Sequence, residues 1–164
     1  MAVPFTPDEK RMTDEFLTPV FPTVPFLDCQ RIVLCRPSHP GNIGAAARAM
    51  KTMGLGYDTR GPQLILVNPL CAVDEVAVRR ASGAADLVAG CRIVDSLAEA
   101  LVGCTGAFGM TVRARELGPE PMQPKAAVAA AKSHWLAGGE GGACSAFVFG
   151  NETNGLTNEE LQHC

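Results

Sequence analysis

Short apolar runs alternate with amphipathic stretches from Arg31 to the end of the chain. Five of these runs are apolar at nearly every position and are flanked by Gly, Pro or Asn, which is typical of strands buried on both faces. They predict strands at Ile32–Cys35, Gln63–Asn68, Cys91–Val94, Thr105–Met110 and Cys144–Phe149. Strands that alternate with helices through short links predict an α/β sandwich with a mostly parallel sheet.

The stretch Ile43–Met53 has the clearest helical period. Its apolar residues Ile43, Ala46, Ala47, Met50 and Met53 fall on one side, and Arg48, Lys51 and Thr52 fall on the other. Asn42 is the predicted N-cap of this helix. Further helices are predicted at Asp74–Ala81, from a capping box at Ser96 to Val102, at Lys125–Leu136 after Pro124, and after a second capping box at Thr157.

Residues 1–28 differ from the rest of the chain. Five prolines interrupt them, and their apolar residues follow neither a helical nor a strand period. We expect an N-terminal extension here, with Phe21 or Phe26 packed on the body of the protein or on a second subunit. Residues 29–164 then form one domain, a size that can bury a core without disulfide staples.

The composition narrows the function. A formal net charge of −3 argues against nucleic-acid binding by bulk charge, so any RNA contact must come from a local basic cluster. The seven cysteines include no C-x-x-C pair, which favours reduced thiols in a cytoplasmic protein over a disulfide framework or a zinc site. No stretch is long enough to span a bilayer, and the N-terminus does not resemble a signal peptide.

Three loops follow predicted strands and are rich in Gly, Pro or polar residues: 36–42, 111–123 and 150–156. Ligands bind beyond the carboxyl ends of parallel strands, so we expect the three loops to converge on one site. Glu152 lies in the third loop, and an arginine from a neighbouring loop is its expected partner. Arg36, Arg48, Lys51, Arg60, Arg113 and Arg115 would form a local basic patch nearby.

Two common nucleotide-binding motifs are missing. The chain has neither the G-x-G-x-x-G fingerprint nor a G-K-[ST] phosphate loop, which argues against NAD and ATP sites. A Rossmann-type oxidoreductase and a bare interaction domain that docks a partner through the N-terminal extension stay open as alternatives.

Two motifs carry a resemblance to a known family. Asn42, Gly44 and Arg48 form N-x-G-x-x-x-R, and Gly150, Glu152, Gly155 and Leu156 form G-x-E-x-x-G-L. Because the two motifs occur in this order, each at the end of a predicted strand, the chain resembles the SpoU/TrmH branch of the SPOUT methyltransferases. It most resembles the TrmJ-type tRNA ribose 2′-O-methyltransferases of that branch. The resemblance implies a Rossmann-like three-layer sandwich with a C-terminal trefoil knot, a homodimer, S-adenosylmethionine as the methyl donor, and tRNA modified at anticodon-loop nucleotide 32.

The resemblance also implies roles for individual residues. The catalytic residues would be Arg48, Asn42 and Glu152, with Arg48 as clamp and stabiliser of the developing oxyanion. The cofactor would contact Met110, Thr111, Val112, Gly150, Asn151, Glu152 and Leu156. RNA would contact Arg36, His39, Lys51, Arg113 and Arg115, and no metal is implied.

The chain departs from the family pattern in three places. Met110 stands in the second loop where relatives have a Thr-Ser-Ala-Arg run, and the link Gly56–Gln63 is longer than usual. The third family motif, a Ser-Leu-Asn segment, would follow Cys164. We therefore expect a truncated form of a longer enzyme with an incomplete knot, weak cofactor binding and no turnover. The alternative is a cofactor- or RNA-binding module of this fold without turnover.

Overall fold

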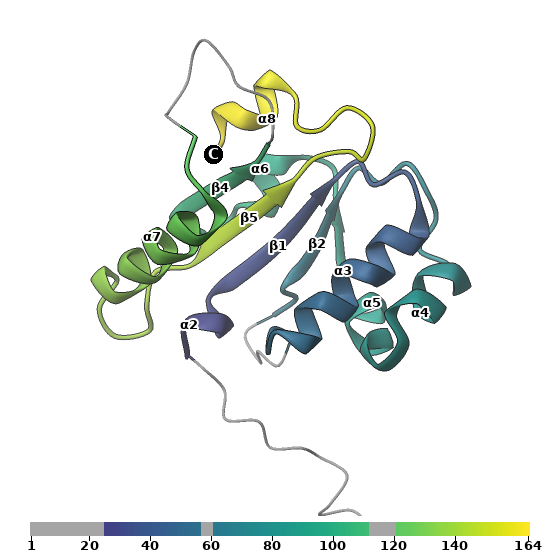
Figure 1. The fold of residues 1–164 in the computed structure, drawn as a ribbon, viewed down its shortest axis with the longest axis horizontal. Helices are drawn as coiled ribbons and strands as arrows, with labels where there is room; N and C mark the ends of the chain where they lie inside the picture. The colour runs from purple at the N-terminus through teal and green to yellow at the C-terminus, as the bar shows by residue number, and fades with distance from the viewer. Residues whose placement is uncertain (1–24, 57–60, 112–120) are drawn as a thin grey trace, which may run out of the picture.

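A computed structural model describes residues 25–56, 61–111 and 121–164 of the chain. Five strands form one sheet in the order β3-β2-β1-β5-β4, and every neighbouring pair is parallel (Figure 1). The strands are β1 (Gln30–Cys35), β2 (Leu64–Val67), β3 (Arg92–Val94), β4 (Gly106–Met110) and β5 (Ser145–Phe149). The parallel α/β sheet predicted from the alternating pattern is confirmed, with each strand boundary within two residues of its expected place.

Helices cover both faces of this sheet. They are α2 (Pro25–Asp28), α3 (Pro40–Thr52), α4 (Glu75–Ala81), α5 (Ala85–Ala89), α6 (Leu97–Ala100), α7 (Pro124–Ala137) and α8 (Asn158–Gln162), with a 3₁₀ turn η1 at Ser82–Ala84. One face packs against α3, α4, α5 and α7, and the opposite face packs against α6 and α8. The molecule is therefore a three-layer sandwich. The trefoil knot stays a prediction.

The two faces of β1 divide the core. Val33 and Cys35 belong to the cluster under α6 and α8, whereas Ile32 and Leu34 pack against the cluster under α3, α4 and α5. Strand β2 is buried at all four positions, as its continuous apolar run predicts. The edge strands are more open, because Ile93 in β3 is 55% exposed and all five residues of β4 are half-buried.

Two helix predictions need correction. The first predicted helix begins at Pro40 rather than Ile43 and ends at Thr52, so Met53 lies beyond its last turn and is 70% exposed instead of buried. The predicted capping box at Ser96 is only half formed: Ser96 Oγ accepts from the Glu99 amide, whereas the Glu99 carboxylate accepts from Arg92. The capping box at Thr157 forms both of its hydrogen bonds.

The expected extension is described only from Pro25. Its last four residues form α2, where Phe26 meets Trp135 of α7 edge-on, with 6.1 Å between ring centroids. Packing of Phe26 on the body is thus confirmed, while Phe21 lies outside the described residues. All seven cysteines lie in the described part of the chain, and none of them forms a disulfide there. Within this part, no helix is long and apolar enough to cross a membrane.

Candidate functional site

The carboxyl ends of β1 and β5 lie side by side where the strand order reverses. From β1 the chain adds β2 and then β3 on one side, whereas β5 and β4 lie on the other side. Open α/β sheets bind ligands at such a switch point, beyond the carboxyl ends of the strands. The loops after β1, β4 and β5 all leave this edge of the sheet, as the sequence predicts for parallel strands.

The turn after β5 is built by the side chain of Asn151. Its Oδ1 accepts hydrogen bonds from the amides of Thr153 and Asn154, at 3.0 and 3.2 Å, and its backbone carbonyl accepts from the amide of Gly155 at 2.7 Å. Gly155 has a φ of +69°, a conformation that favours glycine. Asn151 is 6% exposed, so its side chain serves the turn. Its expected contact with a cofactor stays a prediction.

Both ends of this turn depend on tight packing. A Cβ on Gly150 would lie 2.1 Å from the backbone of Gly155 and Leu156, so only glycine fits between the two arms of the turn. Leu156 is 2% exposed and joins the core cluster under α6 and α8. The second family motif therefore supplies the turn glycines and the apolar anchor that hold Glu152 at the sheet edge.

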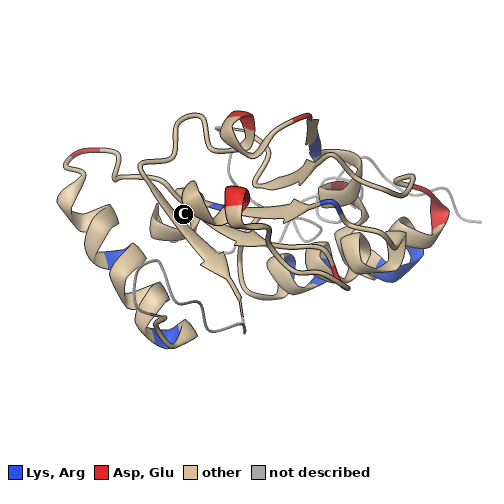
Figure 2. Ribbon diagram, turned by 90° about the horizontal axis from the view of Figure 1, so that it is seen from above, with Lys and Arg blue, Asp and Glu red and all other residues tan. Residues whose placement is uncertain are grey.

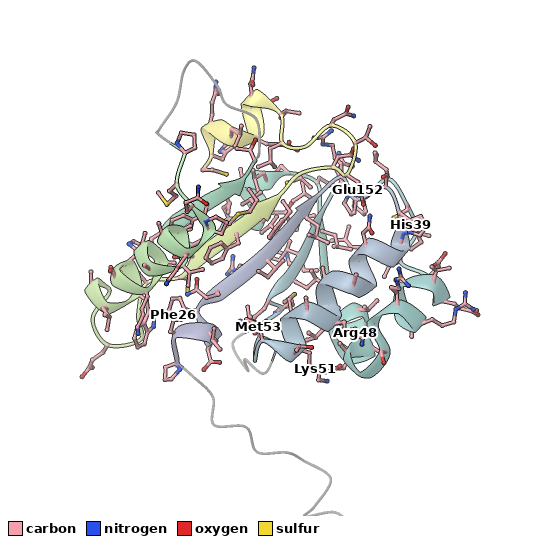
Figure 3. The ribbon with its side chains drawn as sticks, viewed as in Figure 1. Phe26, His39, Arg48, Lys51, Met53 and Glu152 are labelled. Carbon is pink, nitrogen blue, oxygen red and sulfur yellow. The ribbon has the colours of Figure 1, made fainter. Side chains whose placement is uncertain are left out.

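The carboxylate of Glu152 reaches across to the loop after β1 (Figure 3). Oε2 accepts from the amide of Ser38 at 2.9 Å and from its hydroxyl at 2.7 Å, and Oε1 accepts from the side-chain amide of Asn42 at 2.8 Å. The predicted arginine partner is therefore wrong: the partners are the backbone amide and hydroxyl of Ser38 and the side-chain amides of Asn42 and, at 3.4 Å, Asn151. The predicted meeting of the first and third loops is confirmed.

These hydrogen bonds fix the charge of Glu152. Burial alone would raise the pKa of Glu152, but the hydrogen bonds from Asn42 and Ser38 outweigh it and lower the pKa to about 2. The carboxylate is thus ionised at neutral pH and already holds its donors. Such a group is a weak proton acceptor. Its chemistry suits an anchor between two loops better than a general base.

Helix α3 begins one turn earlier than predicted, and its cap is His39. The ring Nδ1 of His39 accepts from the amide of Gly41 at 3.0 Å, and Pro40 occupies the first helical position. The prediction of Asn42 as N-cap is wrong: Asn42 is the third residue of the helix. Its exposed side chain is free to donate to Glu152 because His39 satisfies the helix end.

Arg36 was expected to contact RNA, and the structure directs its side chain inward. Its Nε and Nη2 donate to the two carboxylate oxygens of Glu160 in α8, at 3.0 and 2.9 Å. Burial acts to raise the pKa of Glu160, but the hydrogen bond from Arg36 and others from Thr157 lower it overall. The guanidinium is therefore engaged in an ion pair, and its RNA role stays a prediction.

Arg48 lies away from the Glu152 contacts. It follows Asn42 by six residues, roughly 9 Å along the helix axis and about 120° around it. Its side chain helps to line an open cavity of about 610 Å³ between α3 and α4, together with Ala45, Ala49, Thr52, Met53 and Arg80. Within the described residues, no hydrogen bond or ion pair holds the Arg48 guanidinium, and Figure 3 shows it on the part of α3 remote from Glu152.

Lys51 lies one turn further along α3. Its ammonium donates to both carboxylate oxygens of Asp86 in α5, at 2.7 and 2.8 Å. This pair is remote from the Glu152 turn (Figure 3). Figure 2 shows Lys and Arg gathered on α3 and α4, the side of the molecule that bears Arg48. Of the predicted basic patch, Arg48 and Lys51 lie on α3, whereas Arg36 pairs with Glu160 of α8, so the patch as a whole stays a prediction.

The second predicted loop is described only at its beginning. Met110 ends β4 and pairs in register with Phe149, the last residue of β5, so the starts of the second and third loops are adjacent. Thr111 follows at the exposed edge. Val112, Arg113 and Arg115 lie outside the described residues, as does Arg60. Their roles stay predictions.

Sequence reasoning missed two contributors to the site. Ser38 supplies two of the hydrogen bonds to Glu152, although it lies directly before His39 in the first motif. The loop after β2 also packs here, since the amide of Leu70 and the thiol of Cys71 both donate to the carbonyl of Pro37. A polar Asn-Pro pair at the end of a buried strand was the signal for this loop.

The groups at this edge of the sheet can position a polar ligand. In the described part of the chain, no group of three His, Cys, Asp or Glu side chains could hold a metal ion. The edge offers an ionised carboxylate with fixed donors and apolar surface at Met110 and Phe149. Arg48, which has no partner among these residues, lies further along α3.

Comparisons with known proteins agree with this geometry. Residues 30–164 match the model of the SpoU rRNA Methylase family. The chain is 47% identical over 138 residues to the tRNA (cytidine/uridine/adenosine-2'-O-)-methyltransferase TrmJ of Pseudomonas aeruginosa, covering 84% of this chain and 50% of that protein. It is 46% identical over 139 residues to the tRNA (cytidine/uridine-2'-O-)-methyltransferase TrmJ of Escherichia coli K12, covering 82% of this chain and 50% of that protein. The chain thus spans about half the length of these relatives.

Solved structures show the same fold. A probable methyltransferase from Bordetella pertussis has a TM-score of 0.73 at 39% identity, with 85% of this chain and 79% of that chain covered. TrmJ from Z. mobilis ZM4 has a TM-score of 0.69 at 30% identity, with 80% of this chain and 54% of that chain covered. Both family motifs of this chain lie inside the matched region and meet at the sheet edge. The chain belongs to the SpoU rRNA Methylase family.

Proposed function

We propose that the protein is an S-adenosylmethionine-dependent methyltransferase that acts on a ribose 2′-hydroxyl of tRNA. The observation that carries this proposal is the hydrogen bond between Asn42 and Glu152, because it joins the two family motifs at the switch point of the sheet. The names of the two TrmJ relatives, both tRNA 2'-O-methyltransferases, support tRNA as the substrate.

The ends of β4 and β5 fit one wall of a site for the methyl donor. Phe149 is 39% exposed and pairs in register with Met110, which provides apolar surface for an adenine ring or a thioether chain. Gly155 has open space where a Cβ would stand, so its backbone can approach a ligand closely. When bound, S-adenosylmethionine supplies an electrophilic methyl group, and Met110, Thr111 and the turn at Gly150 would hold it.

The chain's own residues then have separate tasks. Ser38, Asn42 and Glu152 hold the two loops in a fixed arrangement before RNA arrives. Arg48 clamps a phosphate beside the target ribose and stabilises the oxyanion that develops as the hydroxyl attacks. Arginine keeps its proton in proteins, so a phosphate or water accepts the hydroxyl proton. Positioning supplies most of the rate enhancement.

The enzyme we propose is a homodimer. One observation supports this: Ala45, Ala49 and Met53 expose an apolar surface along α3, and Met53 is 70% exposed. Light scattering coupled to size-exclusion chromatography tests the proposal. A mass of two chains is expected, and a monomer at micromolar concentration would contradict it.

We further propose that the enzyme acts in the cytoplasm and that it methylates nucleotide 32 of the tRNA anticodon loop. The test is mass mapping of ribose methylation in tRNA from cells with and without the gene. Loss of a single 2′-O-methyl group in the deletion strain, and its return on complementation, is expected. An unchanged ribose map would contradict the activity, and loss at another nucleotide would contradict the position alone.

The second candidate is a module that binds cofactor or RNA without turnover. It is favoured by the low pKa of Glu152, which makes that carboxylate a weak proton acceptor. Calorimetry separates the two candidates. Binding of S-adenosylmethionine by the full-length protein, without transfer to any tRNA, would favour the module.

A further inference from the structure

Arg36 and Glu160 form the best-shielded ion pair among the described residues. The guanidinium meets the carboxylate through two parallel hydrogen bonds, at 3.0 and 2.9 Å, across 124 positions of sequence. Their side chains are 26% and 14% exposed, whereas those of Arg92 and Glu99 are 42% and 44% exposed. A two-pronged pair shielded from water is stronger and more directional than an exposed one.

Arg36 also forms hydrogen bonds to both ends of the Glu152 turn. Its carbonyl accepts from the side-chain amide of Asn151 at 2.8 Å, and its Nη2 donates to the carbonyl of Gly155 at 3.3 Å. Its own amide donates to Val67 at 2.7 Å, and its φ is +51°, which is uncommon for a residue other than glycine. Such a conformation persists where surrounding contacts over-determine it.

Glu160 connects Arg36 to the N-terminal cap of helix α8. Its Oε2 accepts from the amide of Thr157 at 2.7 Å, and its own amide donates to the hydroxyl of Thr157 at 3.1 Å. The side chain of Glu160 is therefore shared between the N-terminal cap of α8 and Arg36. As a result, the end of β1, the Glu152 turn and the start of α8 are fixed to one another.

We propose that Arg36 and Glu160 are positioning residues that hold the Glu152 turn in register with Ser38 and Asn42. The proposal rests on the proposed function only for its effect on turnover. Arg36 acts through its hydrogen bonds to the turn, and Glu160 acts by orienting the Arg36 guanidinium and neutralising its charge. Neither residue contacts the substrate.

This proposal differs from the expectation that Arg36 binds RNA. Removal of a residue that neutralises a phosphate reduces the salt dependence of RNA binding. Removal of the acidic residue paired with it does not have this effect. A positioning pair behaves in the opposite way. Loss of either member disturbs the same turn, so the two variants share one phenotype and the salt dependence of RNA binding stays unchanged.

The test compares Arg36→Gln and Glu160→Gln in the full-length protein, with Arg92→Gln as the matched control. Arg92 belongs to a surface pair with Glu99 of the same N–O distance, 2.9 Å, on the edge strand β3. Both site variants should lower kcat by about 10- to 100-fold, the range that misplacement of a catalytic group produces. Their tRNA Kd and its salt slope should stay within about twofold of wild type.

A second readout does not depend on activity. Amide hydrogen exchange of Thr153, Asn154 and Gly155 should accelerate in both site variants and remain unchanged in Arg92→Gln. Unchanged exchange in Arg36→Gln and Glu160→Gln would overturn the positioning proposal even if the wild-type protein methylates tRNA. Conversely, a wild-type protein that methylates no RNA would overturn the proposed function, and the exchange data would still decide the positioning proposal.

One result would reinstate direct RNA contact. If Arg36→Gln weakens tRNA binding and reduces the salt slope by about one, while Glu160→Gln does neither, then Arg36 binds phosphate and the positioning proposal is wrong.

Discussion

The two ends of helix α3 hold their polar side chains in opposite ways. At the N-terminal end, His39 and Asn42 are hydrogen-bonded, and the carboxylate that Asn42 meets is 110 positions away in sequence. Towards the C-terminal end, Arg48 projects over an open cavity and has no partner within the described residues. The same helix thus carries a preorganised frame and an unengaged cation. Under the proposed function, the N-terminal end fixes the geometry of the site and Arg48 at the other end is the residue that would contact the substrate.

Removal of Arg48 has the largest expected effect. In the full-length protein, Arg48→Ala should lower the methylation rate by about 100- to 1000-fold, as loss of one group that stabilises a developing oxyanion does. Cofactor affinity and melting temperature should stay near wild type, since the Arg48 guanidinium forms no hydrogen bond or ion pair within the described part of the chain. Single-turnover assays with labelled methyl donor measure the rate.

The matched control for this variant is Arg79→Ala on α4. Arg79 is 71% exposed, pairs loosely with Glu75 at 3.9 Å and does not line the cavity. Its removal should leave the rate within about twofold, because exposed ion pairs of this kind contribute little. Equal losses in Arg48→Ala and Arg79→Ala would mean that only bulk positive charge matters.

The packing between α3 and α4 supports both ends of the helix. A Cβ on Gly44 would lie 2.1 Å from the carbonyl oxygen of Ala77 and 2.8 Å from Cβ of Arg80. Gly44→Ala should lower the free energy of unfolding by about 1–3 kcal/mol, because overpacking outweighs the gain in helix propensity of up to about 1 kcal/mol. Urea denaturation measures the change.

Gly83→Ala is the control for this overpacking, since nothing lies within 4 Å of its added Cβ. It should leave stability unchanged or raise it by up to about 1 kcal/mol. A similar loss in both glycine variants would contradict the close approach of α3 and α4.

The contribution of Glu152 to the stability of the fold depends on pH. Burial acts to raise the pKa of Glu152, but hydrogen bonds from Asn42 and Ser38 lower it from 4.5 to about 2. Because the folded-state pKa is the lower one, the carboxylate stabilises the fold fully above its unfolded pKa, and this contribution disappears as pH falls towards 2. Glu152→Gln should therefore melt below wild type at pH 7, and the two melting temperatures should converge as pH approaches 2. A difference independent of pH would contradict the assigned hydrogen bonds.

The cap at His39 has the smallest expected effect. His39→Ala removes the acceptor for the Gly41 amide and should lower the unfolding free energy by about 0.5–1 kcal/mol. His163→Ala, an exposed position at the end of α8, serves as the control and should change it by less than about 0.5 kcal/mol. A cost at His39 no larger than at His163 would show that the ring does not cap α3.

The sequence was sufficient for the sheet and for the meeting of the two motifs. The strands were predictable because continuous apolar runs bounded by Gly, Pro or Asn leave little choice of boundary. The cap of α3 was missed because His39 is an unusual cap residue and Asn42 is a preferred one. The partners of Glu152 were missed because amides and a hydroxyl satisfy a carboxylate as well as an arginine does.

The role of Arg36 could not be read from its position. Whether an arginine at a strand end faces solvent or turns inward depends on a backbone conformation that is rare for arginine and on a carboxylate 124 positions later. Helix α5 was missed for a related reason: Ser82-Gly83 is typical of a loop, but here it forms a 3₁₀ turn that leads directly into the next helix.

In the proposed function, a methyl group passes to a ribose oxygen at the edge where Asn42 and Glu152 meet. The most direct measurement incubates unmodified tRNA with labelled S-adenosylmethionine and full-length protein, wild type or Glu152→Ala, and identifies the labelled nucleosides by mass spectrometry. The account predicts a single 2′-O-methylated nucleoside with the wild-type protein and at least about tenfold less with the variant. Label on a base, or equal ribose labelling by both proteins, would contradict it.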